Sequence, residues 1–489
     1  MAQTEGAPGM NQTAYETVIG LEVHLQFNTK SKIFCGCANT FGAEPNTVTC
    51  PVCLGLPGSL PVLNQSALEY AIKVALALNC RINPKVRFNR KNYFYPDLPK
   101  GYQISQFELP IGEDGYVELP SDTEERKIRI HRAHLEEDAG KLIHDPAQNC
   151  SLVDYNRAGT PLMEIVTEPD IRSPEEAYFY LQTLKLLLQY LDVSDCDMEK
   201  GSLRCDANIS LRPQGDPQLG TKTELKNMNS FKAVRLALEH EEERQTKTLQ
   251  AGKTIAQETR LWDENLQVTR PMRSKEEAHD YRYFPEPDLM PFHLKPSAID
   301  TLRASLPASP HQTCQRLKSD YDLNAYEAGI LIQDRDLVDF FEACMREYSE
   351  TKKIVNWIIG PLMQETNARK KNLKDLSLSA QAFVDLIKKV ENGMISNLVG
   401  KDVLKIIIDT GQNPDIIISE QGLAQISDAS ALEQVIQEVL AENQKTVEQI
   451  KAGKQSALGF LVGQTMKKTR GKANPKMVNE LLQRRIHNG

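Results

Sequence analysis

The sequence predicts an α+β multidomain protein: a large mixed α/β N-terminal domain with a strand-rich sheet, a helical domain and a small helical tail. Three observations predict this fold class. Short alternating segments separated by turn signals recur up to about Lys295. Amphipathic helical periodicity dominates beyond Pro296, and after about Ser396 the helices become smaller and more basic. At roughly 100–200 residues per domain, the 489 residues suffice for these parts.

The domain boundaries follow these changes in pattern. We expect a disordered leader at 1–14, a mixed α/β domain at 15–295, a helical domain at 296–395 and a basic helical tail at 396–489. The leader lacks the apolar core of a signal peptide and the Arg-rich character of a transit peptide, which indicates a cytoplasmic protein. The longest apolar stretches, such as 354–359, are far shorter than the roughly 18 residues that span a bilayer, so no membrane association is expected.

Several helices can be placed from their periodicity and caps. The Ala/Leu-rich segment 66–79 has apolar residues at helical spacing. A second helix begins after Ser173, an N-cap residue followed by Pro174 and two acids, and runs towards Leu191. In the helical domain, amphipathic helices are expected at 337–348, 352–365 and 380–391.

The segment Ile19–Gln26 is the first strand that carries chemistry. Side chains alternate across a strand, so Leu21, Val23 and Leu25 share one face while Glu22, His24 and Gln26 share the other. A carboxylate and an imidazole on one face can reach a single cation. The competing interpretation is an edge strand with one solvated polar face.

The same pattern recurs in other strands. Polar faces carry Arg204, Asp206 and Asn208 in segment 202–212, and Lys222, Glu224 and Lys226 in segment 222–227. Glu164 is a lone acid inside the apolar segment 161–166, where burial is costly unless the carboxylate is paired or bound to metal. An acidic cluster follows His134 at 136–138.

These faces together predict a polar cavity for metal-assisted phosphoryl transfer. Carboxylates beside a histidine suit Mg²⁺, and neighbouring Lys and Arg suit phosphate or carboxylate groups. A P-loop is absent, because Lys247 stands where the first glycine would precede Gly252-Lys253-Thr254. Any ATP site is therefore of a less common type.

Four of the ten cysteines, Cys35, Cys37, Cys50 and Cys53, fall close together in the sequence. Two close pairs joined by a short loop predict a tetrahedral zinc site with four thiolates, which is structural because no position stays open. Two local disulfides or an iron–sulfur cluster are the alternatives, and disulfides are disfavoured in the cytosol.

Aromatic residues mix with basic and amide residues at 88–97, 101–107 and 280–288. Such segments can stack on bases and contact phosphates, or simply pack tyrosines over a core.

The net charge of −8 argues against a polyanionic partner, but the average conceals an asymmetry. Residues 445–489 carry +8 and the remainder −16. The basic loop of this tail predicts contact with a nucleic-acid backbone, against the alternative of a merely solvated surface. Its candidate residues are Lys467, Lys468, Arg470, Lys472 and Lys476.

Several long segments resemble the B subunit of the bacterial tRNA-dependent amidotransferase. They are 15–24, 90–97, 201–208, 224–227 and 280–288, with 459–464 and 473–475 in the tail. The resemblance implies a cradle-shaped α/β domain, a helical domain and a tail that contacts tRNA. The implied activity is conversion of mischarged Glu-tRNA(Gln), Asp-tRNA(Asn) or both, through ATP-dependent phosphorylation of the side-chain carboxylate and displacement of phosphate by ammonia.

The resemblance also implies partners and site residues. An amidase A subunit supplies ammonia from glutamine through a channel, and the heterotrimer is braced by a small C subunit. The Mg²⁺ ligands correspond to Glu22, His24, Glu137 and Glu164, and the four cysteines hold zinc. Further roles are hypotheses: catalysis for Arg204, Asp206 and Lys226, and ATP binding for Lys91, Tyr93, Asn208 and Glu224.

Two other assignments remain open at this point. One is a noncatalytic tRNA-binding scaffold of such a complex. The other is the related archaeal protein, which acts with an asparaginase-like partner and carries an inserted domain for which this chain has no room.

Overall fold

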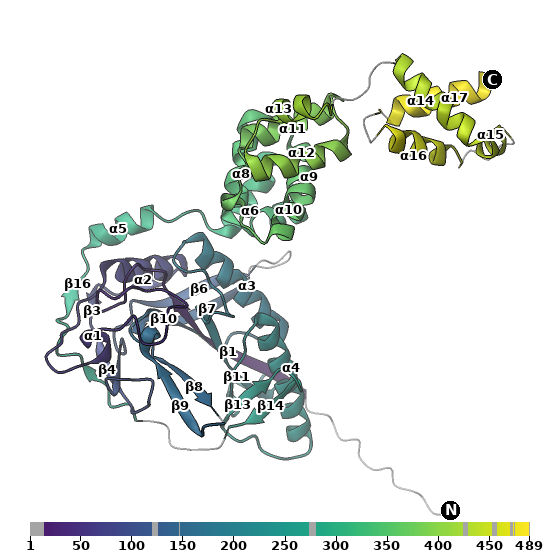
Figure 1. Ribbon diagram of the computed structural model, residues 1–489. Helices are drawn as coiled ribbons and strands as arrows, with labels where there is room; N and C mark the ends of the chain where they lie inside the picture. Colours follow the sequence, from purple (N-terminus) through teal and green to yellow (C-terminus); the bar gives the residue numbers. More distant parts are fainter. Residues whose placement is uncertain are drawn as a thin grey trace, which may run out of the picture. The chain divides into compact units, whose positions relative to one another are not determined.

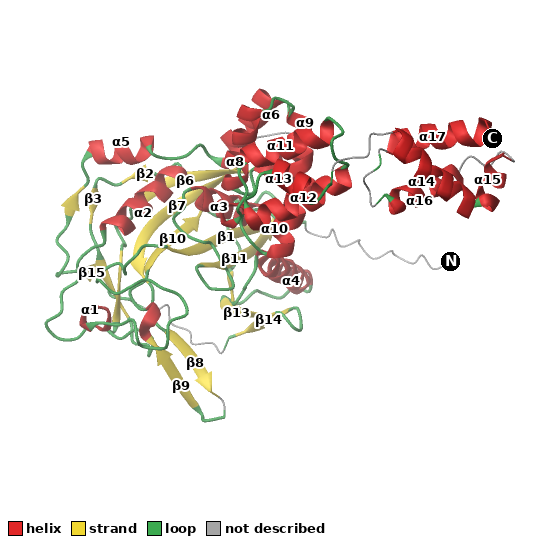
Figure 2. Cartoon of the chain, turned by 45° about the horizontal axis from the view of Figure 1, so that its top comes forward, coloured by secondary structure: helices red, strands yellow, loops and turns green. Residues whose placement is uncertain are grey.

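The computed structural model describes residues 14–119, 126–145, 147–272, 280–423, 429–451, 457–469, 473 and 475–488. The chain divides into two compact units, 1–311 and 312–489. The first unit is built on a large sheet with helices, and the second is helical (Figures 1 and 2). The predicted α+β fold class is confirmed.

A nine-stranded sheet organises the first unit, in the order β14-β13-β12-β11-β1-β10-β7-β6-β2. Neighbouring strands are antiparallel except β12 and β13, which are parallel. The strands are β1 (Tyr15–Gln26), β2 (Arg81–Ile82), β6 (Gly112–Leu119), β7 (Arg126–Glu137), β10 (Pro161–Thr167), β11 (Leu203–Pro213), β12 (Thr223–Lys226), β13 (Glu258–Asp263) and β14 (Val268–Pro271).

Three helices, α2 (Gln65–Ala77), α3 (Pro174–Tyr190) and α4 (Phe231–Gln250), share one apolar core with the sheet. Leu21, Val23 and Leu25 of β1 are buried in it, as the alternation predicts. The predicted start of α3 is also confirmed, because the Ser173 side chain accepts a hydrogen bond from the backbone N–H of Glu176 at 3.1 Å. One face of the sheet is therefore apolar and covered, which leaves the other for polar side chains.

Shorter elements border this sheet. They are the three-stranded sheet β15-β4-β5, the pair β16-β3, the hairpin β8-β9 and the helix α1. Their bounds are β3 (Lys85–Val86), β4 (Asn89–Asn92), β5 (Tyr102–Ser105), β8 (Lys141–Asp145), β9 (Cys150–Asp154), β15 (Phe284–Pro285), β16 (Phe292–His293) and α1 (Pro51–Leu54). Ile299 and Leu302 of α5 (Pro296–Ala304) pack against the core of the first unit, which extends beyond the boundary expected at 295.

The second unit contains two apolar cores. The first spans Leu317–Ile418 and the second Leu432–Ile486. The helices are α6 (Pro310–Tyr321), α7 (Ala325–Leu331), α8 (Arg335–Glu347), α9 (Thr351–Trp357), α10 (Met363–Arg369), α11 (Ala380–Glu391), α12 (Asn397–Thr410), α13 (Pro414–Glu420), α14 (Ala429–Glu442), α15 (Gln444–Lys451), α16 (Leu458–Lys468) and α17 (Pro475–Asn488).

The expected tail boundary at 396 differs from this packing. Ser396 caps α12, whose Val403, Leu404 and Ile407 are buried in the first of the two cores. The small separate core instead begins in α14, because the apolar face of α12 has its partners in the preceding helices. The expected helix at 352–365 is also interrupted by a π-helical turn at 358–362, which contains Pro361 and its missing N–H.

Within the described ranges, no helix combines the length and apolar character needed to cross a membrane.

Candidate active site on the polar face of the sheet

The strand register brings the predicted polar residues to one place. His24 of β1 lies opposite Glu164 of β10 on one side and Arg204 of β11 on the other, while Glu22 lies opposite Asp206. Directly opposite residues of antiparallel strands point to the same face. The alternation read from segment 19–26 therefore becomes a continuous polar surface across β10, β1 and β11.

His24, Glu136 and Glu164 form the centre of this surface. Nε2 of His24 is 3.5 Å from Oε2 of Glu164 and 3.9 Å from Oε1 of Glu136. One ligand atom from each residue lies within 4.8 Å of the others, a spacing suited to one metal ion. Glu136 and Glu164 are buried, with 3% and 8% of their surfaces exposed.

His134 of β7 completes this centre and was not singled out by sequence reasoning. Its Nε2 is 3.5 Å from Glu136 and 3.5 Å from Glu164. Its Nδ1 is buried and has no hydrogen-bond partner in the described part of the chain. The signal was present, because His134 and Glu136 are two residues apart and must share one face of a strand.

The two carboxylates are held ionised in spite of their burial. Burial raises the pKa of Glu136, but the hydrogen bond and the electrostatic interaction with His134 lower it overall. Burial likewise raises the pKa of Glu164, while His134, His24 and Lys91 lower it well below its usual range. For His24, burial lowers the pKa and the carboxylates, Glu164 first, raise it overall.

Glu137, the expected ligand, is placed elsewhere. Its carboxylate pairs with Lys100 and accepts the backbone N–H of Ile104 at 2.8 Å. It borders a cavity of about 60 Å³ that Cys35 and Cys53 also line. Adjacent residues of a strand point to opposite faces, so only one of Glu136 and Glu137 can share the face of His134, and here it is Glu136.

A second group of charges lies beside the centre, on β11 and β12. Nζ of Lys226 is 2.9 Å from Asp206 and 3.0 Å from Glu224. Burial lowers the pKa of Lys226, but Asp206 and Glu224 raise it overall, so the ammonium stays charged. Asn208 donates a hydrogen bond to Glu22 at 3.0 Å, and Glu22 itself stays outside the three-residue metal group.

Arg204 is anchored by Asp138 at the end of β7. Its Nη2 is 3.1 Å from Oδ2 of Asp138, and the side chain of Gln26 donates to the same oxygen at 2.6 Å. Asp138 is 5% exposed, and Arg204 and Arg157 keep its pKa low although burial raises it. The guanidinium is thus held in a fixed direction beside the metal group.

The aromatic segments pack against each other and frame Lys91. Tyr281 lies under the Lys91 ammonium at 4.9 Å and meets the ring of Tyr93 at 6.0 Å. Phe107 stacks on Tyr283 with centroids 4.1 Å apart. Burial lowers the pKa of Lys91, yet Glu136 and Glu164 raise it overall. Lys91 therefore interacts electrostatically with both carboxylates of the metal group.

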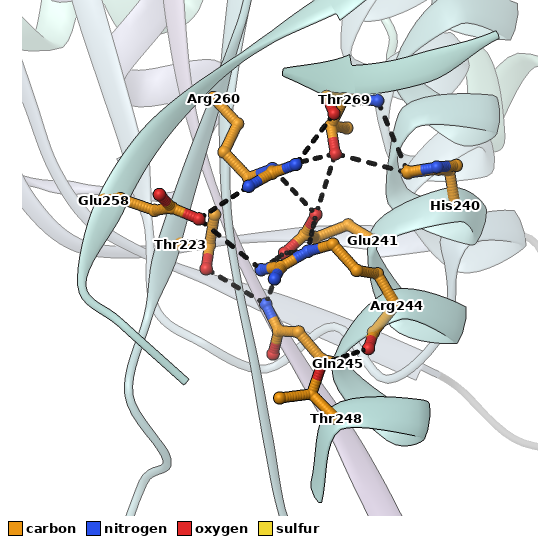
Figure 3. Close-up of polar contacts among 9 residues, drawn as sticks. All are labelled: Thr223, His240, Glu241, Arg244, Gln245, Thr248, Glu258, Arg260 and Thr269. Carbon is orange, nitrogen blue, oxygen red and sulfur yellow. Dashed lines mark hydrogen bonds and ion pairs between the residues drawn. The ribbon is translucent and has the colours of Figure 1, made fainter. Parts of the chain in front are cut away.

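A network of polar contacts around Glu241 joins α4 to the strands at one edge of the sheet (Figure 3). Glu241 of α4 is fully buried and accepts hydrogen bonds from Arg244 Nε at 3.0 Å and Thr269 Oγ1 at 3.0 Å. Arg260 of β13 lies 3.5 Å from Glu241 and 2.6 Å from Glu258. Gln245 donates to both Glu241 and Thr223, so α4 is tied to β12, β13 and β14 by one network.

The four predicted cysteines meet in a second candidate metal centre. Their sulfur atoms all lie within 4.8 Å of one another. The hydrogen bond with Cys35 outweighs burial and lowers the pKa of Cys53 to about 4, while burial raises that of Cys37 to about 11. Four thiols so close cannot all ionise unless a cation replaces their protons, which fits a metal ion.

Lys32 is the other notable residue of the cysteine centre. Its side chain is fully buried, and Nζ is 3.8 Å from Cys53 Sγ and 2.8 Å from the Val48 carbonyl. A buried ammonium beside thiolates offsets part of their negative charge.

The predicted tRNA-contact residues are only partly described. Lys467 is exposed at the end of α16, and Lys468 is paired with Glu438 and Glu442 at 3.0 and 2.7 Å. Arg470 and Lys472 lie outside the described residues, and of Lys476 only its place in α17 is described.

Comparison with known proteins identifies the family of this chain. A family model described as "GatB/GatE catalytic domain" matches residues 17–300, and one described as "GatB domain" matches 339–486. Among curated proteins, the B subunit of the aspartyl/glutamyl-tRNA(Asn/Gln) amidotransferase of Thermoanaerobacter sp. (strain X514) is 53% identical over 96% of this chain and 99% of its own length. The same-named proteins of Moorella thermoacetica and Thermodesulfovibrio yellowstonii are 52% and 53% identical over 96% of this chain and 100% and 98% of their own. The chain therefore belongs to the family of aspartyl/glutamyl-tRNA(Asn/Gln) amidotransferase B subunits.

Proposed function

We propose that this chain performs the ATP-dependent step of transamidation on mischarged Glu-tRNA(Gln), Asp-tRNA(Asn) or both. The side-chain carboxylate of the mischarged amino acid receives the γ-phosphoryl group of ATP, and ADP leaves. Ammonia then attacks the acyl phosphate, forms the amide and releases phosphate. The names of the relatives support these substrates, and their designation as a subunit supports assembly with partners.

The buried group of His24, His134, Glu136 and Glu164 is the observation that carries this proposal. Two ionised carboxylates with nearly all of their surface removed from water are costly unless they serve a cation or a reaction. A metal group with Arg204 and Lys226 beside it fits a phosphoryl-transfer site, because such a site works by positioning the reactants and offsetting their charge.

The residues present fit a divalent metal ion. His24, Glu136 and Glu164 each offer a ligand atom within 4.8 Å of the others, and carboxylate oxygens are ligands that Mg²⁺ prefers. Bound there, Mg²⁺ would offset the repulsion between ATP and the attacking carboxylate. Glu22 lies two residues before His24 on the same face of β1, where its carboxylate accepts a hydrogen bond from Asn208 and would add negative charge beside the metal ion.

The surrounding basic residues have distinct tasks in this scheme. Arg204, oriented by Asp138, is placed to bind the substrate carboxylate or the transferred phosphate. Two lysines contribute positive charge to the site. Lys226 is held between Asp206 and Glu224, and Lys91 lies over the ring of Tyr281. Tyr93 helps exclude water, which would hydrolyse an acyl phosphate.

The remaining parts have supporting roles. A zinc ion held by Cys35, Cys37, Cys50 and Cys53 would stabilise the loop that follows β1. An amidase A subunit would supply ammonia from glutamine, a small C subunit would brace the complex, and the basic tail would contact tRNA.

A transamidation assay tests the proposal. The co-purified complex is given ATP, glutamine and either Glu-tRNA(Gln) or Asp-tRNA(Asn), and formation of the amidated aminoacyl-tRNA is measured for each. The expected result is product that requires ATP. A noncatalytic scaffold is the alternative, and it is excluded if ATP turnover depends on mischarged tRNA and is lost in His24→Ala.

A further inference from the structure

A groove of about 660 Å³ is lined in part by Gln26 and Arg204. Gln26 lies two residues beyond His24 on the same face of β1, and Arg204 lies directly opposite His24 on β11. Two residues of a strand cover roughly 7 Å, so whatever occupies the groove can place an attached group at the metal centre. The volume is within the range of sites for nucleoside-sized ligands.

Most of the cations that line this groove are already paired with carboxylates of the protein. Arg204 and Arg157 both lie against Asp138, at 3.1 and 3.6 Å. Lys200 is paired with Asp195 and Asp197. Among the lining cations only Lys141 makes no ion pair within the described part of the chain. A triphosphate needs several free cations, so the lining favours a ligand of low charge density.

Amides and hydroxyls supply most of the remaining polar lining, and Thr40 and Asn229 are among them. Such groups donate and accept hydrogen bonds at base edges and at ribose hydroxyls. They suit a nucleoside better than an ion.

A large apolar ring lies on the rim of the groove. Phe41 lines the groove and is 78% exposed, and the segment 44–48 that follows it is anchored by hydrogen bonds. Asn156 donates to the Glu44 carbonyl at 2.7 Å and accepts the Val48 N–H at 2.8 Å, while Asn46 donates its side-chain amide to the Val153 carbonyl at 2.9 Å. The loop is thus held before any ligand binds, and it presents the ring to the solvent as a stacking surface.

We propose that this groove holds the unpaired 3′-terminal adenosine of the charged tRNA. The base stacks on Phe41, and the ester-linked amino acid extends past Gln26 and Arg204, so that its side-chain carboxylate reaches the metal group. The inference rests on the proposed function and adds where, and by which residues, the acceptor end is held.

The first test compares Phe41→Ala, Phe41→Tyr and Phe179→Ala in the complete amidotransferase complex. Phe179 is the matched control, a 50% exposed phenylalanine on α3 outside the groove. Loss of one base–aromatic stack weakens binding by about ten-fold or more. The KM for mischarged tRNA should therefore rise by about ten-fold in Phe41→Ala, with KM for ATP unchanged, while Phe41→Tyr and Phe179→Ala behave like wild type.

The second test uses uncharged tRNA, with and without its terminal adenosine, as a competitor of transamidation. In wild type, removal of the adenosine should weaken inhibition by about ten-fold, whereas in Phe41→Ala both competitors should inhibit equally. Combining the protein variant with removal of the adenosine forms a double-mutant cycle. It assigns the weaker inhibition to the contact between the adenosine and the Phe41 ring rather than to a general loss of structure.

Three results overturn the inference while leaving the proposed function intact. They are an unchanged KM for tRNA in Phe41→Ala, a raised KM for ATP alone, and dissociation of the complex by Phe41→Ala. The second result would make the groove an ATP site and the third an interface with a partner protein. Absence of transamidation by the wild-type complex would instead refute the proposed function, and the inference with it.

Discussion

His24 and Glu164 lie directly opposite each other on the antiparallel strands β1 and β10, with Nε2 of His24 3.5 Å from the carboxylate. The pair joins two residues far apart in the sequence through strand register alone. His24 and Glu164 form one half of the buried group. Glu136 and His134 of β7 form the other half.

Glu164→Ala should abolish ATP-dependent transamidation, because it removes a proposed metal ligand and one of the two carboxylates that His24 and His134 share. Glutamine hydrolysis by the complex should remain largely intact, since the proposed function assigns it to a partner amidase. Glu168→Ala is the control, because Glu168 lies just beyond β10 and pairs with the exposed His131 at 3.0 Å. Normal transamidation by Glu164→Ala would refute the metal assignment.

Glu136 and Glu137 can be separated by their metal dependence. Glu136→Gln should raise the Mg²⁺ concentration needed for half-maximal transamidation by about 10- to 100-fold, the range found when residues supporting a metal site are lost. Glu137→Gln should leave that concentration unchanged, since its carboxylate pairs with Lys100. A Mg²⁺ titration of each variant measures the effect, and the reverse outcome would restore the ligand set implied by the resemblance.

Protein purified without chelator should contain one zinc ion per chain, bound by the four clustered thiols. Cys53→Ser should lower zinc content and the Tm of unfolding, because the loop after β1 then loses its cross-link. Cys150→Ser, which alters an exposed cysteine outside the cluster, should change neither. Elemental analysis with thiol titration decides; four reactive thiols in zinc-free protein would contradict the assignment.

Glu241→Ala should lower the free energy of unfolding by about 3–5 kcal/mol, because it leaves Arg260 and Arg244 beside an empty buried position. Glu243→Ala is the matched control on the same helix, with an exposed carboxylate paired only to Lys247. Denaturant titration by circular dichroism measures both. A loss for Glu241→Ala no larger than that for the control would contradict the role of the network.

The same residue should also contribute to the pH dependence of stability. Burial raises the pKa of Glu241, but Arg244, Gln245 and Thr269 lower it overall. A lowered folded-state pKa means that the stabilisation is complete above the unfolded value of about 4.3 and is lost as pH falls below it. Between pH 6 and pH 3, wild type should lose more stability than Glu241→Gln, and equal losses would contradict the shift.

Truncation after Leu423 should weaken tRNA binding at least about ten-fold and flatten its salt dependence, because it removes the segment 445–489 with its net charge of +8. The cut leaves the core that ends at Ile418 intact, which a cut at 396 would not. Binding is measured at several salt concentrations. If the truncated chain binds tRNA with unchanged affinity, the tail is a solvated basic surface and does not contact tRNA.

Local patterns were sufficient for the elements and for part of the site. The alternation in 19–26 placed Glu22, His24 and Gln26 on one face, because strand geometry separates neighbouring side chains whatever lies beside them. Ser173 and Pro174 predicted the start of α3 for a similarly local reason. The four-cysteine centre was visible in the spacing of its ligands.

Long-range pairing decided what these patterns could not. Glu136 and Glu137 are adjacent glutamates, and the sequence alone does not tell which of them faces His24. The register of β7 against β10 places Glu136 near His24 and Glu137 near Lys100. The buried network around Glu241 joins residues of α4, β12, β13 and β14, which no window of sequence contains. The sequence by itself thus determined the chemistry available on each strand and helix, because propensity and alternation are local. Only the tertiary structure decided which of those groups meet, because distances between strands depend on the register of the whole sheet.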